Sequence, residues 1–419
     1  MSLNQKTILV YDDFSGDGPL LLGRLSVSVI KGSESYYFEY DESWLRQTNL
    51  SRILDPELML YPGKQYPVGR HIFGLFADAS PDRWGRVLMQ KRERIRAEKE
   101  GRKPSKLNDS DYLLGVDDAT RMGGIRLKLN HDGPFLANEK ETTVPPWIAL
   151  RSLEEASRHF ENDDTPLLEK WLQQLIRPGS SLGGARPKAS VVDPMGSLWI
   201  AKFPSKNDEN DTGAWEMVVH DLAQRCGLNV PEAKLERFSS LGGTFLIKRF
   251  DRIGNKRVHF ASAMTLLGKV DGASAVDGSS YMDIVDFIRA QGAQPQKDLV
   301  ELWKRIVFNM AVSNTDDHLR NHAFVLQPTG WVLSPLYDVN PVPYGDELSL
   351  NVDEHDNRIN IELAVQTAGR FGISESDAIV YADSIRQIVR ENWESLATHY
   401  GLSRGQIEAM RAAFSASYE

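Results

Sequence analysis

The stretch NTDDHLRN, residues 314–321, places two aspartates, a histidine and two asparagines within eight residues. An aspartate such as Asp316 can accept a hydroxyl proton or orient the hydroxyl for attack. The side-chain oxygen of Asn321, five residues later, can coordinate Mg²⁺ from the same loop. The stretch is therefore either a catalytic loop or a solvated helix cap, and the rest of the chain must decide between them.

A second carboxylate that suits the same chemistry is Asp338, which follows a short apolar run in VLSPLYDVNP, residues 332–341. A phosphate-bridging Mg²⁺ is held by a few protein oxygens together with the substrate phosphates. His318 and His322 lie four residues apart, but no glutamate completes an HExxH motif, so the set favours a hard ion over zinc. The alternative for Asp338 is an Asx turn before Pro341.

A small-residue loop, SSLGGARPK, spans residues 180–188 just before an expected strand. Backbone N–H groups in such a loop can approach phosphate oxygens closely, although the spacing matches neither a Walker A loop nor GxGxxG. A flexible entry to a hairpin is the alternative. In the next strand, Lys202 shares a face with Leu198 and Ile200, which calls for an anionic partner such as a phosphate or Glu216, or for an ammonium that reaches water.

The elements that would position these residues change character along the chain. The start is β-rich, with two strand-like runs around a KGSES turn, an N-cap at Asp41 and a helix opening at 80–82. Strands are expected over 188–192 and 198–203, followed by a helix over 215–226. After about residue 262 the pattern becomes helical, with helix starts at Ser374 and Ser403. The predicted division is 1–128, 147–262 and 263–419.

The composition excludes several classes of protein. The chain has 419 residues and a formal net charge of −9, which argues against a protein whose main role is to coat nucleic acid. A single cysteine, Cys226, excludes an internal disulfide framework and favours a reducing compartment. The N-terminal apolar run is too short for a signal peptide, and no stretch approaches the length of a membrane helix. The expected location is the cytoplasm.

The order of these parts is that of a protein-kinase-like phosphotransferase. The chain also resembles the HipA family of serine/threonine kinases, the toxins of bacterial toxin–antitoxin modules. The resemblance covers nearly the whole chain, is weakest across 98–150, and rests on the strings SSLGGARPKAS, LWIAKFPS, GLNVP, KRFDR, NTDDHLRNHAF and LSPLYDVNP. It implies an α+β, protein-kinase-like bilobal fold with a β-rich N-terminal lobe and an all-helical C-terminal lobe.

The resemblance also implies a role for each matching residue. The catalytic residues would be Asp316, His318 and Asn321, with Asp316 as the base. Mg²⁺ would be held by Asn321 and Asp338, and Lys202 would contact the ATP phosphates. The other residues implied to bind ATP are Gly183, Gly184, Ala185, Arg186, Pro187 and Lys188 in a phosphate loop, Lys248, Arg249 and Phe250 in a hinge, and His318, Leu319, Arg320, Asn321, Tyr337 and Asp338. Ser181, or its neighbour Ser180, would be an autophosphorylated serine whose modification switches the enzyme off.

The chain departs from the family pattern in three places. Asp317 stands where a small residue is usual, which leaves a second candidate for the base. Arg186-Pro187 replaces a more polar pair, and the proline removes one N–H donor. Lys248 replaces an acidic hinge residue.

The implied partners are a HipB-like helix-turn-helix antitoxin, operator DNA reached through that antitoxin, and a protein substrate of which an aminoacyl-tRNA synthetase is the known class. Phosphorylation of that substrate would stall translation. The alternatives are a kinase for a small molecule, a pseudokinase that binds antitoxin and DNA, and a metal-dependent hydrolase that uses Asp316, Asp317 and His318.

Overall fold

The computed structural model describes residues 5–30, 32–47, 52–136, 144–162, 175, 184 and 186–418. Contacts divide the chain into two compact units. Unit 1 comprises residues 1–205 and 251–261, and unit 2 comprises 206–250 and 262–419. The domain boundaries expected from sequence, at 128, 147 and 262, stay predictions.

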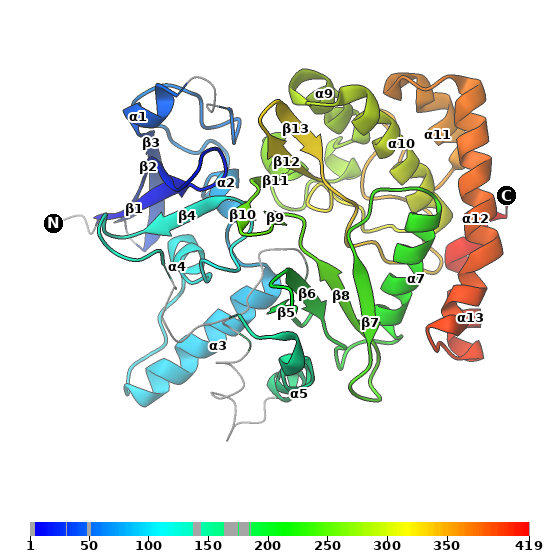
Figure 1. Cartoon of the computed structure of the whole chain (residues 1–419), viewed down its shortest axis with the longest axis horizontal. Helices are drawn as coiled ribbons and strands as arrows, with labels where there is room; N and C mark the ends of the chain where they lie inside the picture. The colour runs from blue at the N-terminus through cyan, green and yellow to red at the C-terminus, as the bar shows by residue number, and fades with distance from the viewer. Residues whose placement is uncertain are drawn as a thin grey trace. The chain divides into compact units, whose positions relative to one another are not determined.

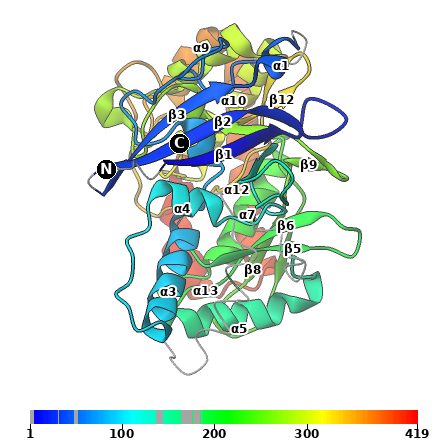
Figure 2. The same ribbon diagram turned by 90° about the vertical axis from the view of Figure 1, so that its left-hand side faces the viewer.

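Unit 1 begins with an antiparallel sheet in the order β3-β2-β1-β4 (Figures 1 and 2). Alternate residues of β3, among them Tyr36, Phe38 and Tyr40, are buried, as the period of a half-buried strand requires. The antiparallel pairing of β2 with β3 confirms the predicted hairpin. The elements of unit 1 are β1 (Gln5–Asp12), β2 (Leu20–Ile30), β3 (Ser33–Tyr40), α1 (Glu42–Leu45), α2 (Gly74–Asp78), α3 (Arg83–Lys99), α4 (Asp109–Leu114), β4 (Ile125–Lys128), η1 (Trp147–Ala149), α5 (Leu150–Glu161), β5 (Lys188–Val192), β6 (Leu198–Lys202), β9 (Arg252–Ile253) and β10 (Lys256–Arg257).

Unit 2 is mostly helical, and α7 and α12 run side by side in it (Figure 1). Its elements are α7 (Thr212–Arg225), β7 (Ala233–Glu236), β8 (Thr244–Lys248), α8 (Ala263–Leu266), η3 (Ala275–Asp277), α9 (Tyr281–Gln291), α10 (Pro295–Ala311), β12 (Ala323–Gln327), β13 (Gly330–Leu333), α11 (Ile361–Thr367), η4 (Ala368–Phe371), α12 (Glu375–His399), α13 (Arg404–Met410) and η5 (Arg411–Ser417). One further short strand, β11 (Phe260–Ser262), spans the boundary between the units. No helix of the described ranges is long and apolar enough to cross a membrane.

The expectation of an all-helical region after residue 262 was wrong over residues 323–333. There β12 and β13 form an antiparallel hairpin with Phe324 opposite Leu333. The strands are only five and four residues long, and so short an apolar run cannot be told from a helical segment by its periodicity. The hairpin begins directly after the NTDDHLRN stretch, and β13 ends shortly before Asp338.

Local signals did predict several element starts. The side chain of Asp41 accepts from the Ser43 amide at the start of α1, and Asp82 caps α3 by accepting from the Gly85 amide. Ser374 and Ser403 cap α12 and α13 in the same way. Each cap satisfies one amide that the first helical turn leaves without a partner, which is why these residue types mark helix starts.

Arg121 holds together the part of unit 1 that precedes β4. Its side chain is fully buried, and its guanidinium donates to the carbonyl oxygens of Ala79, Leu113 and Val116 at 2.9–3.0 Å. Burial lowers the pKa of Arg121 to about 10, so it remains charged at neutral pH. One side chain therefore satisfies carbonyls at the C-terminal ends of α2 and α4.

We expect Arg121→Met to lower the free energy of unfolding by about 3 kcal/mol, because three buried carbonyl oxygens lose their donor. The measurement is the thermal unfolding midpoint from calorimetry. Arg94→Met, on the exposed side of the same unit's α3, is the control and should leave the midpoint nearly unchanged. Equal midpoints for the two variants would contradict the role assigned to Arg121.

Candidate functional site

The centre of the candidate site is the loop that follows α10, where Asp316 and Asp317 have opposite environments. The Asp317 side chain is 1% exposed, whereas that of Asp316 is 78% exposed. One oxygen of Asp317, Oδ2, accepts from Tyr281 Oη at 2.5 Å, Asn309 Nδ2 at 2.7 Å and His322 Nε2 at 2.8 Å. Asp317 is thus a buried anchor for the loop, and Asp316 is the aspartate that faces solvent.

The surroundings of Asp317 keep it ionised. Burial by itself opposes ionisation, but the His322 ring and the hydrogen bonds from His322 and Tyr281 outweigh it, so the pKa of Asp317 lies below its ordinary value. Burial and the Asp317 charge raise the pKa of Tyr281 well above its ordinary value. The phenol therefore stays protonated and remains a donor to Asp317.

Asp316 experiences the opposite shift. Partial loss of hydration and the charges of Asp338 and Asp317 raise the pKa of Asp316, while His318 opposes the shift. The His318 ring lies 4.0 Å from the Asp316 carboxylate. The Asp316 side chain is mostly exposed and keeps much of its hydration. The raised pKa is therefore attributed mainly to the two neighbouring carboxylates.

Asn321 is held in one orientation by the same loop. Its Nδ2 donates to the backbone carbonyl of Asp316 at 2.8 Å, and its side chain is buried. Its Oδ1 is buried and has no hydrogen-bond partner among the described residues. A buried amide oxygen without a donor is costly to leave in that state. It fits a hard cation such as Mg²⁺, which takes oxygen ligands.

Asp338 has a strained backbone. Its φ is 59°, a left-handed conformation that costs a non-glycine residue about 1 kcal/mol or more. The residues before it are fixed, since the Leu336 amide donates to the Asn229 carbonyl and Tyr337 Oη donates to the Arg320 carbonyl at 2.7 Å. Strain of this kind collects at functional sites, and the Asp338 carboxylate is close enough to Asp316 for its charge to raise the pKa of Asp316.

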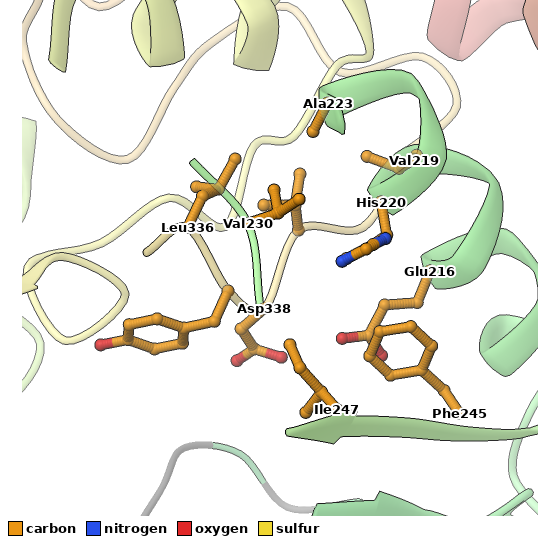
Figure 3. A pocket seen from close by; sticks show the side chains of 11 residues that line it. Glu216, Val219, His220, Ala223, Val230, Phe245, Ile247, Leu336 and Asp338 are labelled. Carbon is orange, nitrogen blue, oxygen red and sulfur yellow. The ribbon is translucent and has the colours of Figure 1, made fainter. Parts of the chain in front are cut away.

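A small cavity of about 20 Å³ lies beside Asp338. One face of α7, carrying Glu216, Val219, His220 and Ala223, lines it together with β8 and the 336–339 segment (Figure 3). Its volume suits about one water molecule. A larger cavity of about 150 Å³ adjoins the same loop and is lined by His318, Leu319 and Arg320 together with Ser349 and residues of the 264–274 segment.

The expected hinge residues lie at the end of β8. The Lys248 amide donates to the Glu232 carbonyl at 2.8 Å, and its Nζ lies 3.3 Å from Glu232 Oε2. Arg249 is buried, and the Phe250 ring lies 5.7 Å from the Tyr337 ring. The last contact joins the expected hinge to the residue before Asp338 within unit 2.

The residues expected to bind phosphate lie in unit 1. Gly183 and Ala185 fall outside the described residues, as do Ser180 and Ser181. Gly184 has a φ of 86°, which favours glycine, and Arg186 Nε donates to the Phe203 carbonyl at 3.0 Å. The Pro187 carbonyl accepts from the Phe203 amide. Lys188 and Lys202 are direct partners across the β5–β6 ladder, and both are buried.

Sequence reasoning missed the residues that anchor the loop. Asn309 and Asn314 are fully buried, and Asn314 Nδ2 donates to Asn309 Oδ1 at 3.1 Å. The only sequence signal for Asn309 is an amide within the apolar run VFNMAV. A polar residue on the buried face of a helix calls for a partner, but the sequence does not say which one.

Comparison with known proteins identifies the family. Residues 180–396, more than half of the chain, match the family described as HipA-like C-terminal domain. The chain belongs to this HipA-like family. Both the proposed catalytic loop and Asp338 lie within the matched residues.

Relatives of known sequence carry kinase names. Two proteins of Sinorhizobium fredii, "Putative kinase Y4mE" and "Putative kinase Y4dM", are each 26% identical to this chain, over 48% and 56% of it. The alignments span 43% and 65% of those two proteins, less than two thirds of either.

Among solved structures, the chain resembles one of the Shewanella oneidensis toxin–antitoxin system, which contains HipA, HipB and operator DNA. The TM-score is 0.68 at 16% identity, covering 97% of this chain and 95% of that one. The HipA-like fold, a mixed α+β chain with antiparallel sheets, therefore extends beyond the matched C-terminal residues.

We expect Asp317→Asn to lower the free energy of unfolding by about 3 kcal/mol, since an amide cannot accept from three donors at one oxygen. The pKa of Asp317 is depressed in the folded state, so its stabilisation is present above the unfolded value of about 3.9 and is lost as pH falls through the folded value. Between pH 7 and pH 3, the difference between the thermal midpoints of the two proteins should therefore stay constant down to about pH 3.9 and narrow below it. A constant difference across that range would contradict an ionised Asp317.

Proposed function

We propose that the protein is an ATP- and Mg²⁺-dependent serine/threonine protein kinase of the HipA type. The observation that carries the proposal is the division of roles between two adjacent aspartates. The Asp317 carboxylate accepts hydrogen bonds from three buried donors. Asp316 is exposed, has a raised pKa and lies in the same loop as Asn321. Asp316 is the base that accepts the proton of the acceptor hydroxyl.

Asn321 and Asp338 are the residues that would hold Mg²⁺. Among the described residues no cluster of three or more His, Cys, Asp or Glu side chains could bind a metal, and the buried, unpartnered Oδ1 of Asn321 suits a hard ion instead. When bound with ATP, Mg²⁺ neutralises charge on the phosphates. The chain's own contribution is to orient Asn321 through the Asp316 carbonyl and to fix Asp338 through its neighbours.

We assign the contacts with ATP residue by residue. Lys202 contacts the ATP phosphates, with Lys188 at the end of the phosphate loop and residues 248–250 as the adenine-side hinge. The larger cavity is lined by His318, two residues after the proposed base in the chain, and we assign it to the acceptor chain. Ser181, or Ser180, is the proposed autophosphorylation site, and its modification would inactivate the enzyme.

The wider role follows from the family. A HipB-like antitoxin would bind the protein and bring it to operator DNA, and phosphorylation of a protein such as an aminoacyl-tRNA synthetase would inhibit translation. The hydrolase alternative requires Asp317 as a reacting group, but its carboxylate is buried and occupied by three donors. The retention of Lys202, Asp316, Asn321 and Asp338 favours an active enzyme over a pseudokinase.

The central test is incubation with Mg²⁺-ATP, followed by intact-mass measurement and peptide mapping. We expect the wild type to gain one phosphate on Ser180 or Ser181. We expect Asp316→Asn to slow this by roughly 10²–10⁴-fold, the usual contribution of a general base. Asp286→Asn, an exposed substitution on α9, is the control and should react like the wild type.

The outcomes of that experiment separate the alternatives. Absence of phosphate and of ATP turnover in the wild type would refute the kinase proposal. Full modification of Asp316→Asn would show that Asp316 is not the base. Phosphate transfer to a small molecule but to no protein would favour the small-molecule kinase.

The pH dependence of kcat/KM gives a second test. A base must be deprotonated, so the rate should fall as pH falls through the raised pKa of Asp316, with a midpoint above the ordinary value of about 3.9. His318→Gln removes the charge that opposes the upward shift in the pKa of Asp316, so the midpoint of the pH profile should be higher in this variant than in the wild type. Circular dichroism at each pH verifies that the protein is folded. A midpoint that falls in His318→Gln would contradict the assignment.

A further inference from the structure

Asp82, far from the phosphate loop in sequence, lies against the residue that ends this loop. Asp82 Oδ2 is 3.0 Å from Lys188 Nζ, and the two side chains are 1% and 2% exposed. Both belong to unit 1. A lysine this deeply buried requires an anionic partner, because an ammonium loses several kcal/mol of hydration on leaving water.

Asp82 is itself held rigidly. Its Oδ1 accepts from the Gly85 amide at 2.8 Å and so caps α3. Directly after the cap, Trp84 packs edge-to-face on Phe160 of α5 at 5.2 Å and belongs to a buried apolar cluster with Leu88 and Ala156. The Asp82 side chain, whose carboxylate contacts Lys188, is therefore held in place by the packed start of α3.

Lys188 is the point at which the small-residue loop becomes strand β5. Its Nζ also lies 3.5 Å from the carbonyl oxygen of Gly184, on the loop side. Its direct partner across the ladder is Lys202, the proposed phosphate-binding lysine. Two lysines side by side repel each other, and a carboxylate beside one of them offsets this charge.

We propose that Asp82 is a positioning residue for the nucleotide site, acting through Lys188. By holding the ammonium of Lys188, the carboxylate fixes the end of the phosphate loop and the start of β5. It also compensates one of the two charges at the Lys188–Lys202 pair. The N-terminal segment of the chain thereby sets the affinity for ATP. This inference rests on the proposed kinase function, because it presumes that nucleotide binds here.

The test measures Kd for Mg²⁺-ATP by calorimetric titration and the thermal midpoint of each variant. Asp82→Asn keeps a capping side chain but removes the charge. We expect it to weaken ATP binding about tenfold, a coupling of about 1.4 kcal/mol and within the range found between contacting residues. Lys188→Met should weaken binding at least as much. In the Lys188→Met background, Asp82→Asn should have no further effect.

The matched control is Asp55→Asn. Asp55 is another fully buried aspartate of unit 1 and accepts from the Leu75 and Glu57 amides. It should lose stability yet keep the wild-type Kd. Should Asp82→Asn fail to fold, Lys188→Arg replaces it, and we expect it to bind ATP more tightly than Lys188→Met because it retains the charge opposite Asp82.

Several results would overturn the inference while leaving the kinase proposal intact. One is an Asp82→Asn protein with a lowered midpoint but an unchanged Kd, which would make the pair purely structural. Another is a double variant whose loss of ATP affinity equals the sum of the two single losses, which would mean that Asp82 does not act through Lys188. A third is an Asp55→Asn protein that loses as much ATP affinity as Asp82→Asn. A wild type that binds no Mg²⁺-ATP would refute the kinase proposal and this inference together.

Discussion

The ionised, fully buried carboxylate of Asp317 is the interaction on which the geometry of the site depends. A carboxylate removed from water is tolerated only if its lost hydration is replaced, here by donors from α9, from α10 and from the end of the loop itself. These donors fix the backbone on both sides of Asp317. Asp316, its neighbour, is then presented to solvent instead of being drawn into the core.

The same two residues illustrate how one side-chain type can serve two tasks. Asp317 has a lowered pKa because cationic and hydroxyl donors outweigh its burial. Asp316 has a raised pKa because it lies near two other carboxylates and loses part of its hydration. When environments separate the pKa values of adjacent groups in this way, the group with the raised value is the better candidate for proton transfer near neutral pH.

The features that the sequence predicted are those that depend on residues close together in the chain. Helix caps at Asp41, Ser374 and Ser403 could be read because the capping side chain and its amide are neighbours in the chain. The β5–β6 hairpin could be read from its apolar runs. The sequence favoured Asp316 over Asp317 as the base, but it could not predict the burial of Asp317, since this depends on Tyr281 and Asn309, which reach Asp317 only in the folded chain. The Asp82–Lys188 pair is missing from the sequence reading for the same reason.

Buried amides extend the influence of the Asp317 anchor to the second carboxylate. Asn309 donates to Asp317 and accepts from Asn314, and Asn314 in turn accepts from the backbone amide of Asn340. Asn340 is two residues beyond the strained Asp338, whose left-handed conformation needs support from its surroundings. The loop that carries Asp316 and the segment that carries Asp338 are thus joined by one continuous set of hydrogen bonds. A change at Asn309 or Asn314 would disturb both carboxylates together, although neither amide approaches solvent.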